Sequence, residues 1–307
     1  MQRLKKWAAA ACCLALAGAL AGCGAAPSAP EDGKVRVVAS LFPQYDFTRQ
    51  IAGELAEVTL LLPPGVESHS FEPTPADILK IDGADLFVYT GAAMEPWAER
   101  LAGSLTGEVK VVDVSANIPL DAEEDGDGHD HGGVDPHIWT SPQNAKRMVD
   151  NLTAALAEAD PAHAGTYRTN AAAYKERLDA LDAELRELVE HAARREIVFG
   201  GRFALHYFVK EYGLDYLAAF DSCSHETEPS ARAVAGIVDE IEGKGIPVIY
   251  YEELADPKVA RAIAEETGAE PLLLHSCHNV SRQELEEGAT YLSLMEQNVQ
   301  NLREGLY

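Results

Sequence analysis

Histidine is the residue type in this chain whose number and placing could do chemistry. The chain has ten histidines. His163 and His191 fall near the ends of a predicted helix and need no role beyond an exposed helical position. The others gather mainly in loops that follow predicted strands, where parallel α/β sheets collect their ligands. Because imidazole suits Zn²⁺ and neighbouring transition metals, this pattern predicts a metal site.

Two of these loops are stiffened by proline. His69 lies between Gly65 and Pro75, just after a predicted strand, and His137 directly follows Asp135-Pro136. Proline restricts the backbone, so both imidazoles are expected at fixed positions. The sequence has no His-Glu-x-x-His, nucleophile elbow, phosphate-binding loop or dinucleotide glycine fingerprint, so no zinc peptidase or nucleotide-binding enzyme is indicated.

The elements that must position these histidines alternate between strand and helix. Strands are predicted at 35–40, 58–62, 85–89, 109–112, 197–199, 215–220, 248–251 and 272–274, and helices at 43–54, from 75, at 95–105, 203–212, 229–242 and 257–267. A capping box from Ser281 to Glu284 is expected to open the last helix. This alternation is typical of parallel sheets. We expect an α/β protein with an N-terminal lobe at 34–140 and a C-terminal lobe at 193–307.

Helix dominates the stretch between the lobes, residues 141–192, with a new helix expected at Asp160-Pro161. One apolar seam follows at spacings of four and three: Tyr167, Ala171, Tyr174, Leu178, Leu181, Leu185 and Leu188. A coiled-coil dimer is one interpretation of the seam. Since the seam lasts about three heptads, a spine packed along both lobes of its own chain is favoured, and we expect a monomer.

The first 22 residues have the pattern of a secretion signal. Arg3, Lys5 and Lys6 precede an apolar run, which leads to Leu20-Ala21-Gly22-Cys23. This ending resembles a bacterial lipobox, in which Cys23 would be lipidated and residues 23–33 would form a tether to membrane lipid. An ordinary signal peptide, with Cys23 there by chance, is the alternative.

Charge limits the possible partners. The chain has 25 Lys and Arg against 50 Asp and Glu, a formal net charge of −25. Nucleic-acid binding needs a basic face, so no nucleic-acid partner is expected. Part of the acid lies in a polar, glycine-rich loop at 121–135 that also carries His129 and His131. Weak capture of a metal ion is its expected role, and a solvated acidic loop is the alternative.

The two histidine motifs carry a family resemblance. Gly-x₃-His-x-Phe-Glu-Pro-Thr-Pro and Asp-Pro-His-Ile-Trp resemble the metal-binding lipoproteins of bacterial ABC importers, the zinc/manganese substrate-binding family (cluster A-I). The resemblance covers residues 34–307, and the closing stretch 288–298 also looks like the family's final helix. It implies two α/β lobes joined by one long backbone helix, a metal held between them with two ligands from each, and delivery to a membrane permease driven by a separate ATPase.

The resemblance assigns His69 and His137 directly as the N-terminal ligands, but the C-terminal lobe departs from the family pattern. Arg202 stands at the family's third ligand position and cannot ligate, since it has no acceptor. His206, one helical turn later, or His225, after the next strand, is expected in its place. His275 is expected as the fourth ligand.

Residues around these ligands are expected to support them. Glu72 and Glu226 are candidates for orienting the histidines, and Arg202 is expected to pair with one of them. Cys223 and Cys277 lie in the same two loops as His225 and His275, as extra soft ligands or as a disulfide.

The predominance of imidazole favours Zn²⁺ over Mn²⁺, which prefers carboxylates and water. A closed four-ligand site leaves no position for catalytic water, so no enzymatic activity is expected. Three alternatives stay open: a receptor for Mn²⁺, Fe²⁺ or Ni²⁺, a three-histidine zinc hydrolase, and an adhesin that contains a structural metal.

Overall fold

The computed structural model describes residues 33–122, 133–220 and 229–307. The chain divides into two units, residues 1–33 and 34–307, and the architecture below is that of the second. Its strands are β1 (Val35–Ala39), β2 (Ala56–Leu60), β3 (Leu86–Tyr89), β4 (Lys110–Asp113), β5 (Glu196–Arg202), β6 (Asp215–Phe220), β7 (Val248–Tyr251) and β8 (Glu270–Leu273). Among the described residues, none of the helices has the length and apolar character needed to cross a membrane.

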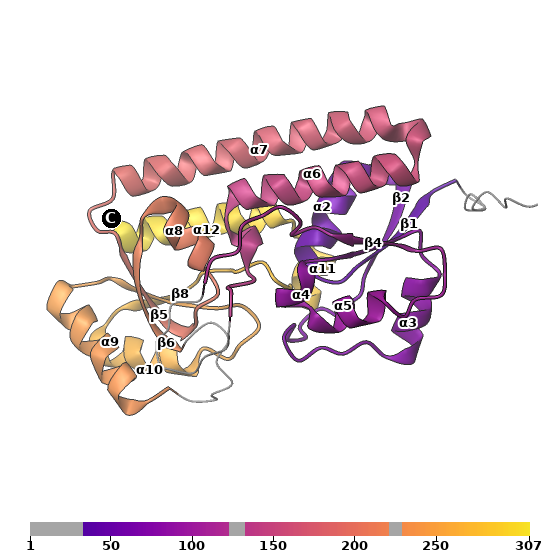
Figure 1. Ribbon diagram of the computed structural model, residues 1–307. Helices are drawn as coiled ribbons and strands as arrows, with labels where there is room; N and C mark the ends of the chain where they lie inside the picture. The colour runs from indigo at the N-terminus through magenta and orange to yellow at the C-terminus, as the bar shows by residue number, and fades with distance from the viewer. Residues whose placement is uncertain (1–32, 123–132, 221–228) are drawn as a thin grey trace, which may run out of the picture. The chain divides into compact units, whose positions relative to one another are not determined.

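The strands form two four-stranded sheets with the same topology (Figure 1). The first has the order β2-β1-β3-β4 and the second β6-β5-β7-β8, and every pairing is parallel. The predicted α/β class with two parallel sheets is confirmed. Because parallel strands share a direction, the loops after the strands of each sheet meet at one edge, where ligands of such sheets are bound.

Helices cover these sheets. They are α2 (Phe42–Ala52), α3 (Pro75–Asp82), α4 (Gly91–Met94), α5 (Pro96–Ala102), α8 (His206–Tyr212), α9 (Ala231–Lys244) and α10 (Lys258–Thr267). Helix α3 begins as predicted, with Thr74 as its N-cap in a capping box with Asp77. The capping box at Ser281 opens only the short α11 (Arg282–Glu286), so its assignment to the last helix was wrong. The last helix, α12 (Tyr291–Leu306), has its own capping box at Thr290.

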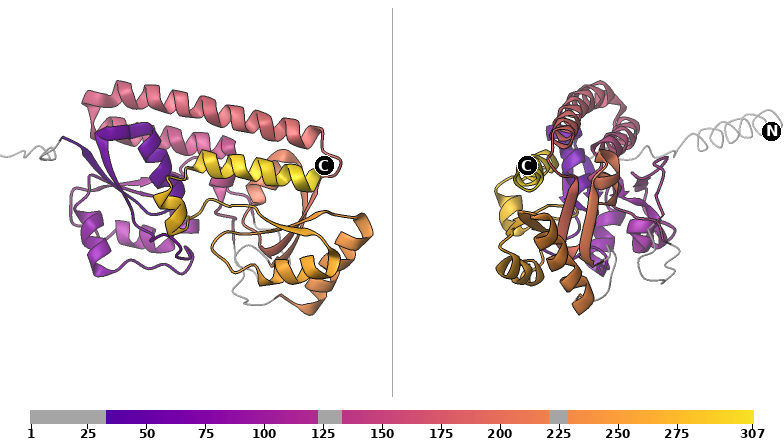
Figure 2. Two further views of the ribbon diagram at one scale, coloured as in Figure 1. Left: turned by 180° about the vertical axis from the view of Figure 1, so that it is seen from behind. Right: turned by 90° about the vertical axis from the view of Figure 1, so that its left-hand side faces the viewer.

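A long helix joins the two halves. Helix α6 (Pro142–Ala159) leads through a 3₁₀ turn (Pro161–His163) into α7 (Ala164–Glu190), which has 27 residues. All seven residues of its apolar seam are buried. Helix α7 packs against α2, α6 and α12 of the same chain, and Figure 2 shows it alongside α6 and α12. The seam is therefore used within the chain, as the spine interpretation requires, and is not free for a coiled-coil partner.

The core is continuous across both sheets. One hydrophobic cluster includes Val37 and Leu86 of the first sheet, Phe199 and Tyr250 of the second, and the seam of α7. Two smaller clusters lie on the outer faces, one under α3 and α5 and one under α9 and α10. Each sheet is thus covered on both faces, and the shared core fixes the loops at their edges.

Candidate metal site

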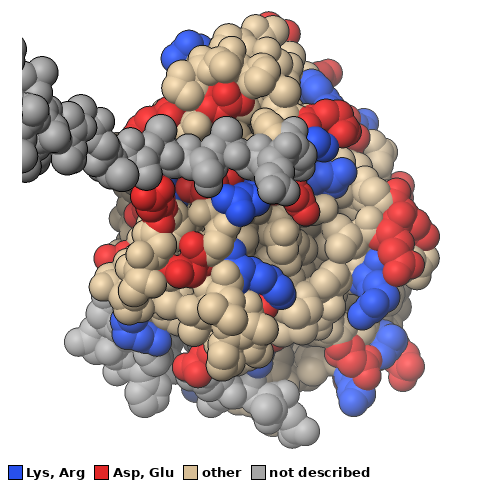
Figure 3. Space-filling model, turned by 90° about the vertical axis from the view of Figure 1, so that its right-hand side faces the viewer, with Lys and Arg blue, Asp and Glu red and all other residues tan. Residues whose placement is uncertain are grey.

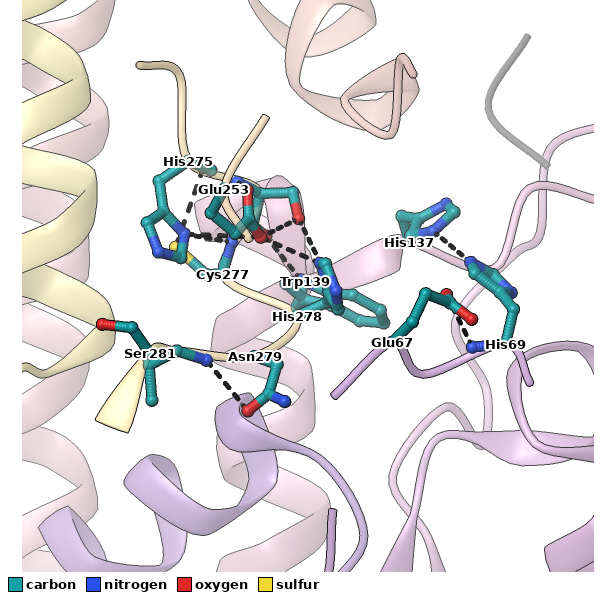
Figure 4. A network of polar contacts seen from close by, with 12 residues as sticks. Glu67, His69, His137, Trp139, Glu253, His275, Cys277, His278, Asn279 and Ser281 are labelled. Carbon is teal, nitrogen blue, oxygen red and sulfur yellow. Dashed lines mark hydrogen bonds and ion pairs between the residues drawn. The ribbon is translucent and has the colours of Figure 1, made fainter. Parts of the chain in front are cut away.

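The polar side chains of interest lie in the loops after the strands. His69 follows β2, Arg202 ends β5, Glu253 follows β7, and His275 and His278 follow β8. His137 directly precedes a 3₁₀ turn (Ile138–Thr140) that leads into α6. Figure 4 shows most of these groups together.

His69 and His137 form a close pair. Their Nε2 atoms lie 3.3 Å apart and their rings meet edge to face. Two nitrogens that each lie about 2.05 Å from one tetrahedral Zn²⁺ are about 3.3 Å apart. The pair already has the spacing that a single ion would require of two ligands.

Asp135 fixes the ring of His137. One of its carboxylate oxygens, Oδ1, lies 2.9 Å from Nδ1 and also accepts the backbone N–H of His137 at 2.8 Å. Both residues are buried. Burial would raise the pKa of Asp135, but the hydrogen bonds and charge of His137 outweigh it and lower that pKa. A proton on Nδ1 leaves the Nε2 lone pair for a metal, the arrangement that metal-binding histidines commonly have.

A second carboxylate shapes the turn of His69. Glu67 accepts the backbone N–H groups of His69 and Ser70, each at 2.9 Å, and these bonds outweigh partial burial to lower its pKa. The pKa of His69 falls to about 4, first because its ring is partly desolvated and then because of the charge of His137. His69 is therefore neutral, and able to ligate, near pH 7. Glu72, predicted to support this ligand, is exposed three residues further on.

His278 has the same arrangement as His137. Its Nδ1 lies 2.8 Å from Oε1 of the buried Glu253, which also accepts the N–H and O–H groups of Ser276. Burial lowers the pKa of His278, but Glu253 outweighs it and the net shift is upward. His278 is near enough to His69 for its charge to lower the pKa of His69, and Glu67 in turn raises that of His278. With its proton on Nδ1, the ring of His278 would have the Nε2 lone pair for a metal.

His275 has a different environment. Its Nδ1 accepts the backbone N–H of Cys277 at 2.8 Å, so the proton of the neutral ring belongs on Nε2. That Nε2 is buried without a hydrogen-bond partner. Asn298 holds the backbone of His275 through two bonds of 2.7 Å. The two histidines thus differ in what holds Nδ1: a backbone N–H for His275, with Oε1 of Glu253 at 3.5 Å, and Glu253 itself at 2.8 Å for His278.

The other C-terminal candidates lie at the edge of this group. Glu252, next to Glu253, accepts the backbone N–H of Arg202; burial raises the pKa of Glu252, and the charge of Arg202 opposes that shift. On α8, Nε2 of His206 lies 3.5 Å from Oδ2 of Asp121, at the base of the acidic loop. Cys277 is a buried free thiol. The remaining predicted residues lie outside the described part of the chain: Cys23, His129, His131, Cys223, His225 and Glu226.

In the part of the chain that the structure describes, no three His, Cys, Asp or Glu side chains come close enough together to hold a metal ion. The arrangement is a matched pair, His69 and His137, with His278 nearby.

The sequence interpretation missed four residues of this arrangement. Asp135 had a usable signal, since it stands two residues before His137 in the motif Asp-Pro-His. Glu253 stands two residues after a correctly predicted strand, but nothing in its neighbours distinguishes it from Glu252. Glu67 and His278 had no signal beyond their closeness in sequence to His69 and His275.

The fold has two α/β lobes that share a core and a spine helix, and imidazoles lie in the loops after their strands. These features define a bilobed metal-binding receptor. Comparison with known proteins agrees with this class. The profile of the family described as ZnuA, zinc-uptake complex component A periplasmic, matches residues 37–305. The chain belongs to this family.

Its relatives include the high-affinity zinc uptake system protein ZnuA of Bacillus subtilis, which is 35% identical over 98% of each chain. The zinc-binding lipoprotein AdcA of Streptococcus pneumoniae is 34% identical, and the match spans 89% of this chain but only 56% of AdcA. The solved Zn(II)-bound ZnuA-like domain of that AdcA has a TM-score of 0.77 at 32% identity, covering 89% of this chain and 99% of the domain. The laminin-binding protein Lmb of Streptococcus agalactiae, described as an adhesin with metal-transporting activity, has a TM-score of 0.78 at 30% identity, covering 89% of this chain and all of Lmb.

Proposed function

We propose that this chain is the substrate-binding component of a zinc ABC importer, with Zn²⁺ as its cargo and His69, His137 and His278 as ligands. The observation that carries the proposal is the 3.3 Å between the Nε2 atoms of His69 and His137. The carboxylates on Nδ1 of His137 and His278 support it, because a proton held on Nδ1 leaves the Nε2 lone pair of each ring for a metal. Family membership supports the transport role and gives no indication of catalysis.

The donor set favours zinc among the divalent ions. Three imidazoles suit Zn²⁺, whereas Mn²⁺ prefers oxygen ligands. A fourth ligand would come from the C-terminal lobe, where His225, Cys223 and His206 are the candidates. His275 is the alternative to His278, but a backbone N–H already occupies its Nδ1.

Calorimetric titration of the metal-free protein lacking residues 1–23 tests the proposal. We expect one Zn²⁺ per chain, bound more tightly than Mn²⁺. A matched control is His191→Ala, which removes an imidazole at the exposed end of α7 and should leave binding unchanged. Equal affinity for the two ions, or equal losses in His137→Ala and His191→Ala, would contradict the zinc site.

The proposal extends to the ends and partners of the chain. Residues 1–22 would be a signal peptide, and Cys23 would carry lipid that anchors the protein outside the cytoplasm, through a tether at 23–33. Lobes at 34–140 and 193–307, linked through 141–192, would act as a monomer that docks on a permease with its ATPase. Two measurements test the lipid. The Cys23→Ala variant should be released from membranes, and the mass of the anchored protein should include a lipid on Cys23.

Surface charge is consistent with a cation as cargo rather than a nucleic acid as partner. On the face shown in Figure 3, Lys and Arg side chains are interspersed with Asp and Glu. Ion pairs such as Arg36–Asp85 and Lys80–Asp77 use basic side chains within the chain. His129 and His131 would add weak metal capture in the acidic loop.

Adhesion is a second candidate function, favoured by the description of the structural relative Lmb. Binding of the purified protein to immobilised laminin, with Zn²⁺ and with chelator, tests it. Saturable binding is expected if the chain shares this activity.

A further inference from the structure

Residues 276–281, which we call the strap, run from the end of β8 to the start of α11 and are fastened to the N-terminal lobe. Asn279, which is fully buried, donates from Nδ2 to the carbonyl oxygens of Pro63 and Val66, both at 2.9 Å. The carbonyl of Val280 accepts the N–H of Gly65 at 2.8 Å. These contacts join segments more than 200 residues apart in the sequence.

The same strap is pinned at its other end. Trp139, which is also fully buried, donates from Nε1 to the carbonyl of Ser276 at 2.8 Å. Tyr291 donates its O–H to the carbonyl of Trp139 at 2.6 Å. Ser276 itself is held by Glu253 on the side of the second sheet. The strap is therefore a fixed connection between the two sheets.

Every proposed ligand lies within three residues of a bond to the strap. Val66 stands three residues before His69, and Trp139 stands two residues after His137. Asn279 is the neighbour of His278. The two bonds of Asn279 thus join the loop that carries His69 to the strap that carries His278.

These bonds hold the two segments together. Both are partly buried, and without them the carbonyl groups of Pro63 and Val66 would be hydrated by water, so the loop of His69 would be free to move away from the strap. The backbone of the strap has little freedom to compensate, because Cys277 already occupies the left-handed region with φ of 64°. A binding site tolerates errors of only about 0.5 Å in its ligands.

We propose that Asn279 is a positioning residue of the metal site: its two hydrogen bonds hold the loop of His69 against the strap and so set the approach of His278 to the His69–His137 pair. This inference rests on the proposed function. It assigns no contact between Asn279 and the ion.

The test compares Asn279→Ala with Asn151→Ala. Asn151 on α6 also donates two hydrogen bonds from Nδ2, to the carbonyls of Val114 and Ala116 at 2.9 and 3.0 Å. Neither carbonyl belongs to the strap, and both lie at the start of the connection after β4, far in sequence from His137 at its end. Thermal unfolding without metal, Zn²⁺ affinity by chelator competition, and the visible spectrum of the Co²⁺-loaded protein are measured for both. Both variants should unfold at lower temperature. Only Asn279→Ala should bind Zn²⁺ about 10- to 100-fold more weakly, the usual effect of removing a group that orients metal ligands.

The Co²⁺ spectrum separates positioning from stability. A distorted or incomplete ligand shell in Asn279→Ala should weaken the absorption of tetrahedral Co²⁺, while Asn151→Ala should keep the spectrum of the unaltered protein. Unchanged zinc affinity and spectrum in Asn279→Ala would overturn the inference. If the unaltered protein does not bind Zn²⁺, the proposed function fails instead, and the positioning role fails with it.

A second variant covers the case in which Asn279→Ala does not fold. Asn279→Asp keeps the size of the side chain and keeps Oδ1, which accepts the N–H of Val280 at 2.9 Å. It replaces Nδ2, the donor of both hydrogen bonds, by an oxygen that cannot donate. It should weaken Zn²⁺ binding at least as much as Asn279→Ala. Full zinc affinity in a folded Asn279→Asp would also overturn the inference.

Discussion

The N-terminal and C-terminal lobes hold their histidines in different ways. In the N-terminal lobe both candidate imidazoles, His69 and His137, present Nε2 to one another at 3.3 Å. In the C-terminal lobe His206 lies beside an aspartate and His275 accepts a backbone N–H. Oε1 of Glu253 lies 2.8 Å from Nδ1 of His278 but 3.5 Å from Nδ1 of His275. A histidine becomes a ligand candidate through what holds its other nitrogen, and position in the sequence is a weaker guide.

Replacing the two histidines of the strap region one at a time tests this contrast most strongly. We expect His278→Ala to weaken Zn²⁺ binding by about 100-fold or more, since loss of a ligand should exceed the 10- to 100-fold effect of losing its support. His275→Ala should keep zinc affinity within about threefold while it lowers the free energy of unfolding by about 1–3 kcal/mol, because a buried, packed ring is removed. Calorimetry and chemical denaturation of the metal-free protein measure the two effects.

The opposite result would support His275 as the ligand, as the sequence predicts. If His275→Ala abolishes zinc binding and His278→Ala does not, His275 is the ligand and its buried Nε2 must turn toward the ion. His163→Ala, in the 3₁₀ turn before α7, removes a half-buried imidazole beside Asp160 and controls for unspecific effects of such a loss on zinc affinity.

Replacing Asp135 and Glu253, the carboxylates that hold His137 and His278, should have the next largest effect on zinc affinity. Asp135→Asn and Glu253→Gln keep the shape of each side chain but remove the charge that holds Nδ1–H of His137 and His278. Each should weaken Zn²⁺ binding about 10- to 100-fold. Similar losses would show that the two halves of the site are equivalent. Full affinity in Glu253→Gln alone would mean that the ion is bound by the N-terminal half without His278.

The pH dependence of binding should come mainly from His278. Burial lowers its pKa, but Glu253 outweighs burial, so the pKa lies above the ordinary value of about 6.5. Zn²⁺ binds the neutral ring, so a proton competes as pH falls through this pKa, and affinity should drop about tenfold per pH unit. His69, with a pKa of about 4, should remain neutral over this range.

Zinc titrations between about pH 8 and pH 5 measure this effect. Glu253→Gln removes the charge that raises the pKa of His278, so the loss of affinity should begin at a lower pH in that variant. A flat profile in the unaltered protein, or an identical onset in the variant, would show that a proton on His278 does not compete with the metal.

The fold was largely predictable because its signals are local. Short apolar runs between helical segments gave β6 and β7 with their observed limits, and the seam spacing of α7 identified a helix buried within its own chain. The error at Ser281 arose because two capping boxes occur within ten residues, and a local motif says nothing about how far its helix continues.

The site was less predictable because its C-terminal half depends on distant contacts. The motifs around His69 and His137 were informative since each loop is fixed by its own prolines and carboxylate. His275 and His278 are three residues apart and both follow β8. What separates them is their distance from Glu253, which follows another strand: its Oε1 lies 2.8 Å from Nδ1 of His278 and 3.5 Å from Nδ1 of His275, and these contacts exist only in the folded chain.

His206 should have the smallest effect on zinc affinity. Its ring faces Asp121, which also pairs with Lys210 at 2.7 Å, so it belongs to an ion-pair group at the base of the acidic loop. Such pairs contribute at most about 1 kcal/mol, and His206→Ala should lower the free energy of unfolding by that amount or less. Zinc affinity should change less than about threefold, as in the matched control Lys210→Ala, which removes the other partner of Asp121. If His206→Ala instead loses as much zinc affinity as His278→Ala while Lys210→Ala keeps it, α8 supplies a ligand. Each lobe would then contribute two ligands to the site.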